Sequence, residues 1–276
     1  MDPPAGPPWD SPVSAIAFAF VDLEMTGLDV SRDRVVEVCI ERVVGADAVA
    51  RVDTLVDPGD RAGGAVHVHG LDAAALAGAP SFPSIAPAVL AALDGAIPVA
   101  HAAEWDERFL MAECRRAGVH LDVPYWLDTL VLARRAFALH SHSLDALCAA
   151  LNIERGRAHR AASDVCAMRQ VFDRCVAMLQ PVSARDLWEV RVGDRRARQA
   201  IVHACEAAAK NGAPLSLVYR PSRKPAESLC MVVLEVRSDL DPPRVVGYQL
   251  PGRGRRQLRA DRILHVEFPS NPVRIS

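Results

Sequence analysis

The chain has 276 residues, enough for one large domain or two ordinary ones, and 50% of them are hydrophobic, as in a globular protein. The formal net charge is −2, but residues 1–180 carry −9 and residues 181–276 carry +7, which favours an acidic module followed by a basic one. The seven cysteines show neither paired nor zinc-type spacing, which argues against a disulfide scaffold and for free thiols in a reducing cytoplasm.

The chain opens with a Pro-rich stretch that has no basic n-region and no apolar run long enough for a membrane span. We therefore expect residues 1–13 to form a disordered tail on a cytoplasmic protein that has no membrane partner.

Residues 14–180 are predicted to form an α/β domain, a mixed sheet with helices on its faces. The expected strands cover 14–24, 34–44, 47–58, 96–102 and a short stretch around Trp126. The expected helices lie near 84–94, 103–118, 128–138, 143–151 and 160–179. A loop rich in Gly, Ala and Pro fills the interval before the first helix.

Residues 181–276 follow a different pattern. A linker with a helix near 194–210 occupies 181–212, and only strand-like runs separated by turns follow it in 213–276. The sequence therefore predicts a small all-β module at this end.

Asp22 and Glu24 stand at the end of the first predicted strand. Because side chains two apart on a strand point the same way, both carboxylates project together from one sheet edge. A strand that runs out into a solvated turn would give the same pattern, so the pair alone leaves both interpretations open.

Two further acids occupy the first turns of helices that start near the same sheet edge, Asp106 in "HAAEWDERFL" and Asp164 in "HRAASD". Taken singly, each is explained by the favourable interaction of an acid with a helix N-terminus. His159 precedes Asp164 by five residues and is expected on the loop that leads into the helix, where a neutral histidine can accept a proton near pH 7. A loop histidine without a role is the alternative.

Four carboxylates that converge on one place repel one another unless cations neutralise them. Carboxylate ligands without cysteine favour hard ions such as Mg²⁺ or Mn²⁺. Two such ions stabilise the attacking and leaving oxygens of a phosphoryl displacement.

The segments "FVDLEMTGLD", "HAAEWDERFL" and "HRAASD" resemble, in order and spacing, the three motifs of the DEDD exonucleases of the histidine branch. "VHVHGLDAAALAGAPSF" and "LDTLVLARRAFALHSHSLDALCAALNI" are similar to segments of the epsilon proofreading subunits of bacterial DNA polymerase III. The resemblance covers about residues 15–180.

This resemblance implies a ribonuclease-H-like fold and 3′→5′ exonuclease activity with two Mg²⁺ or Mn²⁺ ions. By the same resemblance, Asp22, Glu24 and Asp164 would ligate metal directly. Asp106 would hold the second ion largely through water, and His159 would be the general base.

The resemblance also implies substrate contacts. The backbone of Met25 and Thr26 would meet the terminal nucleotide and Leu28 would wedge near its base. His69 would line the terminal-nucleotide pocket, or be a loop histidine without a role. His101 would serve strand-end packing or substrate contact.

The second motif departs from the family pattern His-Asn-x-x-Phe-Asp, because Ala102 replaces the Asn and Trp105 the Phe. The carboxylate is kept, so the chemistry is expected to survive, whereas a lost amide hydrogen bond weakens or alters substrate positioning.

We expect single-stranded DNA as the substrate and a DNA polymerase or repair complex as a partner. "DLEMTGLD" also resembles the opening motif of oligoribonucleases, so an exoribonuclease acting on short RNAs is a second reading. A non-catalytic regulator that grips nucleic acid is a third.

Residues 213–276 resemble a WYL domain, a small SH3/Sm-like β-barrel of bacterial regulators and defence proteins, with "GYQL" in place of the Trp-Tyr-Leu strand. Members of that family bind nucleic acid or nucleotide-like ligands. Arg253, Arg255, Arg256 and Arg259 form a basic cluster suited to phosphate contact, and Arg220, Arg237 and Tyr248 would add charge and a stacking face. A solvated basic loop on a structural barrel is the alternative.

Overall fold

The structure is a computed structural model that describes residues 2–61, 64–221, 226–240 and 242–268. The chain divides into two compact units, Met1–Arg191 and Val192–Ser276. The end of the expected β module, residues 269–276, lies outside the described residues. In the part of the chain that is described, no helix combines the length and the apolar character needed to cross a membrane.

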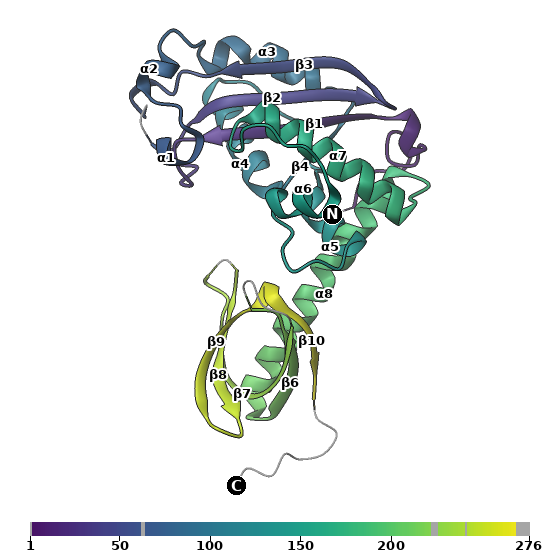
Figure 1. The fold of residues 1–276 in the computed structure, drawn as a ribbon, viewed down its shortest axis with the longest axis vertical. Coiled ribbons are helices and arrows are strands. Elements are labelled where there is room, and N and C mark those ends of the chain that lie inside the picture. The colour runs from purple at the N-terminus through teal and green to yellow at the C-terminus, as the bar shows by residue number, and fades with distance from the viewer. Residues whose placement is uncertain (1, 62–63, 222–225, 241, 269–276) are drawn as a thin grey trace. The chain divides into compact units, whose positions relative to one another are not determined.

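The first unit is built on a five-stranded mixed sheet (Figure 1). Its strands, in the order β3-β2-β1-β4-β5, are Asp47–Leu55, Val35–Val44, Ala17–Met25, Ile97–Ala100 and Leu127–Asp128. The first three strands along the chain pair antiparallel, and β4 and β5 continue from β1 in parallel. This arrangement confirms the predicted mixed α/β sheet.

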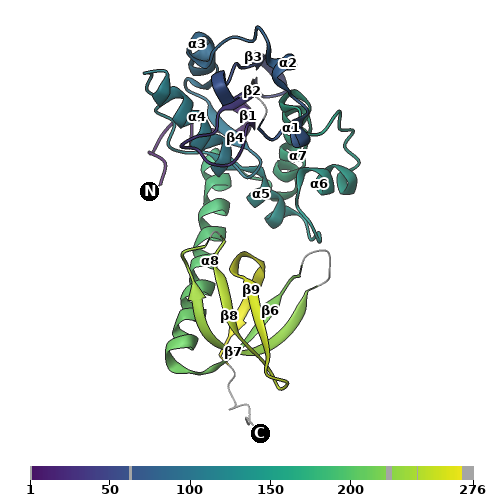
Figure 2. The ribbon, with the colours of Figure 1, turned by 90° about the vertical axis from the view of Figure 1, so that its left-hand side faces the viewer.

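Helices flank this sheet on both sides, with α3 and α4 on one and α7 on the other (Figure 2). The main helices are α3 Phe82–Leu93, α4 Glu104–Arg116, α5 Thr129–Ala136, α6 Leu144–Leu151 and α7 Ala161–Leu179. Each lies within a few residues of its predicted position. The Gly/Ala/Pro-rich loop contains short helices that the sequence did not reveal, η2 Gly59–Arg61, α1 Val66–His69 and α2 Ala73–Leu76.

The start of the chain is not a disordered tail, contrary to the expectation from its proline content. Trp9 is only 4% exposed, and its ring lies edge-on to Tyr125 and Trp188 at centroid distances of 5.9 and 5.7 Å. Arg185 N–H donates to the Trp9 carbonyl at 2.8 Å. A short 3-10 helix, η1 Val13–Ala15, then leads into β1. Burial of one large aromatic residue outweighs the proline-rich composition here.

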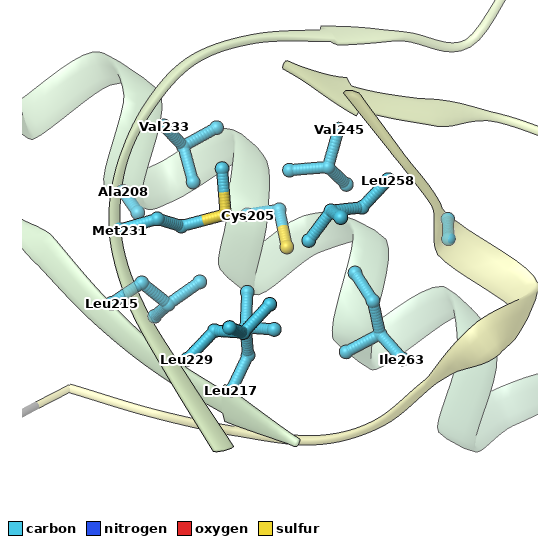
Figure 3. Packing of buried hydrophobic residues seen from close by; sticks show 11 residues of the cluster. Cys205, Ala208, Leu215, Leu217, Leu229, Met231, Val233, Val245, Leu258 and Ile263 are labelled. Atoms are coloured by element: carbon cyan, nitrogen blue, oxygen red, sulfur yellow. The ribbon is translucent and has the colours of Figure 1, made fainter. Parts of the chain in front are cut away.

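The linker helix is longer than predicted. A single helix, α8 Ala184–Asn211, begins ten residues before the expected start at 194 and crosses the division between the units. Its last turns carry Cys205 and Ala208, both fully buried, into the core of the second unit (Figure 3).

The second unit has a curved antiparallel sheet of five strands (Figure 1). Its order is β10-β6-β7-β8-β9, with bounds Ile263–Glu267, Pro214–Tyr219, Glu227–Arg237, Arg244–Leu250 and Gly254–Arg259. A 3-10 turn, η3 Ala260–Arg262, joins β9 to β10. Leu217, Met231, Val245, Leu258 and Ile263 meet the α8 side chains in the core (Figure 3). The predicted strands are confirmed as an antiparallel sheet, but the unit also includes the end of α8 and is therefore not purely β.

Candidate active site

One face of β1 changes from apolar to acidic along its length. Phe18 and Phe20 pack against Phe172 of α7 at ring-centroid distances of 4.9 and 5.3 Å. Asp22 and Glu24 follow on the same face because side chains alternate along a strand. The aromatic contacts therefore fix the helix over the strand, and the two carboxylates emerge beyond them.

The start of α7 brings a third carboxylate to the same place. Asp164 lies in its first turn and is 6% exposed. His159, on the preceding loop, is exposed. One candidate ligand atom from each of Glu24, His159 and Asp164 lies within 4.8 Å of the other two, a spacing that could hold a metal ion. The structure thus brings Glu24 of β1 together with His159 and Asp164, which lie more than 130 residues later in the sequence.

Asp106, in the first turn of α4, is the fourth acid and is also 6% exposed. Strand β4 pairs with β1 only along Phe18–Phe20, so the Leu23 N–H projects beyond the end of β4. Asp106 Oδ1 accepts that N–H at 3.1 Å, on the backbone between Asp22 and Glu24. A buried hydrogen bond therefore holds the Asp106 carboxylate beside Asp22 and Glu24.

Crowding and burial raise the pKa values of these acids. Burial, and then the charges of Asp106 and Asp164, raise the pKa of Asp22 well above its usual range. Burial and the charge of Asp164 raise the pKa of Glu24 to about 7. Burial raises the pKa of Asp106 to about 8, against the lowering effect of its backbone hydrogen bonds. A positive charge bound near these acids would therefore stabilise their ionised forms.

Arg155, which the sequence analysis missed, supplies one such charge. Its Nε and Nη2 donate to Asp164 Oδ1 at 3.0 and 2.6 Å, and its Nη1 pairs with Asp145. The arginine side chain is 10% exposed. No sequence pattern indicated that this residue, on the loop between α6 and α7, would reach the acidic cluster.

Glu37 on β2 is a second residue that the sequence analysis missed. It is 3% exposed and accepts hydrogen bonds from the Arg160 guanidinium and from the Ala161 N–H. An acid inside the apolar run "VVEVCIERVV" was the available signal, since a buried carboxylate requires a partner.

The turn that follows β1 contains the predicted substrate-contacting residues. Thr26 is buried and exchanges backbone and side-chain hydrogen bonds with Arg34, while its Oγ1 also donates to Asp33. Met25 is half-buried, and Leu28 is 67% exposed at the outer part of the turn. The hydrogen-bonded turn therefore carries an exposed apolar side chain four residues after Glu24.

His69 lies at the end of the short helix α1 and is 1% exposed. Its Nδ1 accepts the Leu71 N–H at 3.0 Å, and its Nε2 lies 3.2 Å from the Gly64 carbonyl. Burial lowers the pKa of its ring. These bonds use both ring nitrogens to hold the histidine's own loop, so substrate contact by His69 stays a prediction.

His101 lies at the end of β4. Its ring nitrogens contact Thr129 Oγ1 at 2.9 Å and the His142 carbonyl at 3.0 Å, and burial lowers the pKa of the ring. These contacts join β4 to the start of α5 and to the segment before α6. Strand-end packing accounts for all of them, and a substrate contact by His101 stays a prediction.

Ala102 adopts a left-handed backbone conformation with φ of 62°. Its N–H donates to Asp128 Oδ1 at 3.0 Å, and the same oxygen caps α5 by accepting the Leu130 N–H at 2.8 Å. Among non-glycine residues, asparagine tolerates this conformation far better than alanine. The backbone thus gives a physical reason for the asparagine of the resembled motif, and alanine is strained here.

Arg253, Arg255 and Arg256 lie in the second unit, on the turn between β8 and β9 and at the start of β9, and all three are exposed. Arg255 stands opposite Tyr248, which is 39% exposed, and Arg256 Nε donates to Gln249 Oε1 at 2.7 Å. Three members of the predicted basic cluster therefore lie exposed at one edge of the curved sheet, whereas Arg259 is half-buried and pairs with Asp261 at 2.8 Å.

Comparisons with known proteins agree with the first unit. The sequence model of a family described as exonuclease matches residues 19–172. The DNA polymerase III PolC-type protein of Thermotoga maritima is 32% identical over 183 residues, which are 66% of this chain and 13% of that protein. The DNA polymerase III subunit epsilon of Aquifex aeolicus is 30% identical over 158 residues, 56% of this chain and 78% of that protein.

Other relatives extend well beyond this chain. A DNA polymerase III subunit epsilon-like protein of Rhodobacter capsulatus is 35% identical over 179 residues, 62% of this chain but 25% of that protein. The chain therefore spans between an eighth and a quarter of the length of several relatives. E. coli exonuclease I in complex with a dT13 oligonucleotide superposes with a TM-score of 0.56 at 18% identity, covering 85% of this chain and 55% of that one. That likeness supports the fold.

Replacing Ala102 by glycine should stabilise the protein by about 1 kcal/mol, because glycine adopts the left-handed conformation without steric cost. Ala103→Gly is the matched control. Ala103 is fully buried with φ of −49°, so its replacement should destabilise. Denaturant midpoints measure both variants, and a destabilised Ala102→Gly variant would contradict the assignment of strain.

The acidic cluster should make the metal-free protein less stable as pH rises from 6 to 8.5. The pKa values of Glu24 and Asp106 are raised to about 7 and about 8 in the folded chain, so it keeps protons that the unfolded chain has already lost. Stability therefore falls through this window.

Thermal unfolding in the presence of EDTA tests this dependence. Asp106→Asn keeps the acceptor for Leu23 N–H but not the charge, so it should flatten the decline, whereas Asp122→Asn at an exposed site should not. Equal slopes in all three proteins would refute the cluster's contribution.

Proposed function

This chain belongs to the exonuclease family, and from that premise we propose that it removes nucleotides from the 3′ end of single-stranded DNA by metal-dependent hydrolysis. The observation that carries the proposal is the convergence of Asp22, Glu24, Asp106 and Asp164 on one end of β1, with His159 beside them. Burying four like charges is costly, and cations that bind a phosphodiester would offset this cost.

The donor set fits Mg²⁺ or Mn²⁺, since it consists of carboxylates and one imidazole without cysteine. Asp22, Glu24 and Asp164 would hold the ions directly, and Asp106 would hold the second one largely through water. Two bound ions would supply charge stabilisation for the attacking and leaving oxygens of the displacement.

The protein's own groups would perform the remaining steps. His159 is exposed beside Glu24 and Asp164, where its imidazole would take the proton of the attacking water. The backbone of Met25 and Thr26 would seat the terminal nucleotide, and Leu28 would pack against its base. The hydrogen bonds of Thr26 with Arg34 keep that turn in place without help from substrate.

Single-stranded DNA is favoured because a structural neighbour is described in complex with a dT13 oligonucleotide and several relatives are named as DNA polymerase III proteins. A DNA polymerase or a repair complex is the proposed partner on the same grounds. Cleavage of short RNAs is the second candidate, based on the opening motif "DLEMTGLD". All seven cysteines are unpaired, in keeping with the proposed cytoplasmic location.

For the second unit we propose a WYL-like barrel that binds nucleic acid. The curved five-stranded antiparallel sheet supports this, together with the exposed row of Tyr248 and Arg255 across β8 and β9. A basic edge with a stacking ring suits a single strand, because phosphates and base faces are both available there.

The reaction is tested with 5′-labelled single-stranded DNA and RNA of one sequence, incubated with Mg²⁺ or Mn²⁺. We expect a ladder that shortens from the 3′ end, faster on DNA. Asp164→Asn should slow it by more than about 100-fold, because losing even an indirect partner of a metal costs 10- to 100-fold. Asp173→Asn, an exposed site on the same helix, is the control.

Metal-dependent stability separates an enzyme from a non-catalytic regulator. Mn²⁺ should raise the midpoint of thermal unfolding of the parent protein, since it binds the folded state, and Asp164→Asn should abolish the gain. A folded protein with neither a ladder nor a gain would refute the proposal. If the ladder forms faster on RNA than on DNA, short RNA and not single-stranded DNA is the substrate.

The basic edge is tested by replacing Arg253 and Arg255 with glutamine. Binding of a single strand should weaken and its logarithmic salt slope should decrease by roughly 0.7 per lost phosphate contact. Arg174→Gln, an exposed arginine on α7, removes a charge elsewhere and should leave the slope unchanged. Unaltered affinity of the double variant for the single strand would instead support the interpretation of these arginines as a solvated basic loop.

A further inference from the structure

We infer that Glu37 is a positioning residue for the reaction proposed above, on which the inference rests. Through Arg160 and the backbone of Ala161, Glu37 fixes the loop-to-helix junction that carries His159 and Asp164. None of these contacts was expected from the sequence, because they join residues 123 and 124 positions apart.

Glu37 uses both carboxylate oxygens in this junction. Arg160 Nε lies 3.1 Å from each oxygen, Arg160 Nη2 lies 2.8 Å from Oε1, and the Ala161 N–H donates to Oε2 at 3.0 Å. Glu37 is 3% exposed, so water competes little with these bonds. Charge-assisted, bidentate pairing of this kind fixes orientation as well as distance.

The junction needs such a support. His159 has a left-handed backbone with φ of 58°, and Arg160, at the N-cap of α7, is extended and gives no side-chain cap to the helix. A non-glycine residue in that conformation is disfavoured by about 1–2 kcal/mol. Glu37 satisfies the first helical N–H from another strand and thereby replaces the missing cap.

The pairing of β1 with β2 places Glu37 beside the proposed reacting groups. Glu37 lies directly opposite Glu24 in the antiparallel register of β1 and β2. Glu24, in turn, lies within ligand distance of His159 and Asp164. A displacement of the junction therefore moves the base and one acid relative to the other. A misplacement of about 1 Å can lower a rate about 100-fold.

A second ion pair provides a matched control. Glu41 lies on the same face of β2, four residues after Glu37, and accepts from Arg169 of α7 at 3.1 Å. Arg169 follows Arg160 by nine residues, which is about 13 Å along a helix. Both pairs join β2 to α7, but only the first one touches the segment that carries His159. A purely structural role predicts equal effects of the two.

The test compares Glu37→Gln with Glu41→Gln in the full chain. Glu37→Gln should lower kcat about 10- to 100-fold with KM changed less than about threefold, while Glu41→Gln keeps kcat within about twofold. Arg160→Gln should reproduce Glu37→Gln, and the double variant should be no worse than either single one, because the two residues act as a unit. Equal losses of kcat in the two glutamate variants would overturn the inference, as would no loss in either.

Hydrogen exchange keeps this result separate from the proposed function. In the metal-free protein, peptides that cover residues 157–164 should exchange faster in Glu37→Gln than in the parent protein. Their exchange should be unchanged in Glu41→Gln. If the parent protein hydrolyses no substrate, the proposed function fails and exchange alone decides whether Glu37 holds the junction. Unchanged exchange in Glu37→Gln would overturn the inference even in an active enzyme.

Discussion

The mutual repulsion of carboxylates at the end of β1 is the constraint on which the rest of the first unit depends. Asp22 and Glu24 share a face because a strand has a period of two, and Asp106 and Asp164 join them from the first turns of two helices. Burial makes the repulsion severe, as the raised pKa values show. Stable folding therefore requires aromatic packing behind the acids and fixed contacts around them.

Arginines divide the buried acids of this unit into two groups. Glu37 and Glu113 are held by Arg160 and Arg34 in bidentate pairs, and these acids tie elements of the fold together. Asp22, Glu24 and Asp106 form no ion pair among the described residues. The acids of the first group stabilise the fold through their arginine partners. The charges of the second group are not neutralised by an ion pair. The absence of an arginine partner thus distinguishes Asp22, Glu24 and Asp106 from the acids that support the fold, whereas Asp164 pairs with Arg155.

The sequence was sufficient where a local rule governs position. Alternation along β1 placed Asp22 and Glu24 together, and helix starts placed Asp106 and Asp164 at the same edge. It was insufficient where a contact joins distant segments, as with Arg160 and Glu37, because no local pattern specifies the partner of a buried charge. The prediction of a disordered tail from the proline content was wrong for a similar reason. The partners of Trp9 lie more than 110 residues away.

Arg155 occupies an intermediate position between the two groups of acids. It pairs with Asp164, which belongs to the cluster, and with Asp145, which does not. Its guanidinium supplies one positive charge to a cluster that needs several, so it reduces the repulsion without removing it. A cation bound at the cluster would compete with Arg155 for Asp164, whereas Glu37 would meet no such competition because its partners lie outside the cluster. The geometry therefore supports the proposed division between Glu37, which would hold the junction, and Arg155, whose charge at Asp164 a bound metal ion would displace.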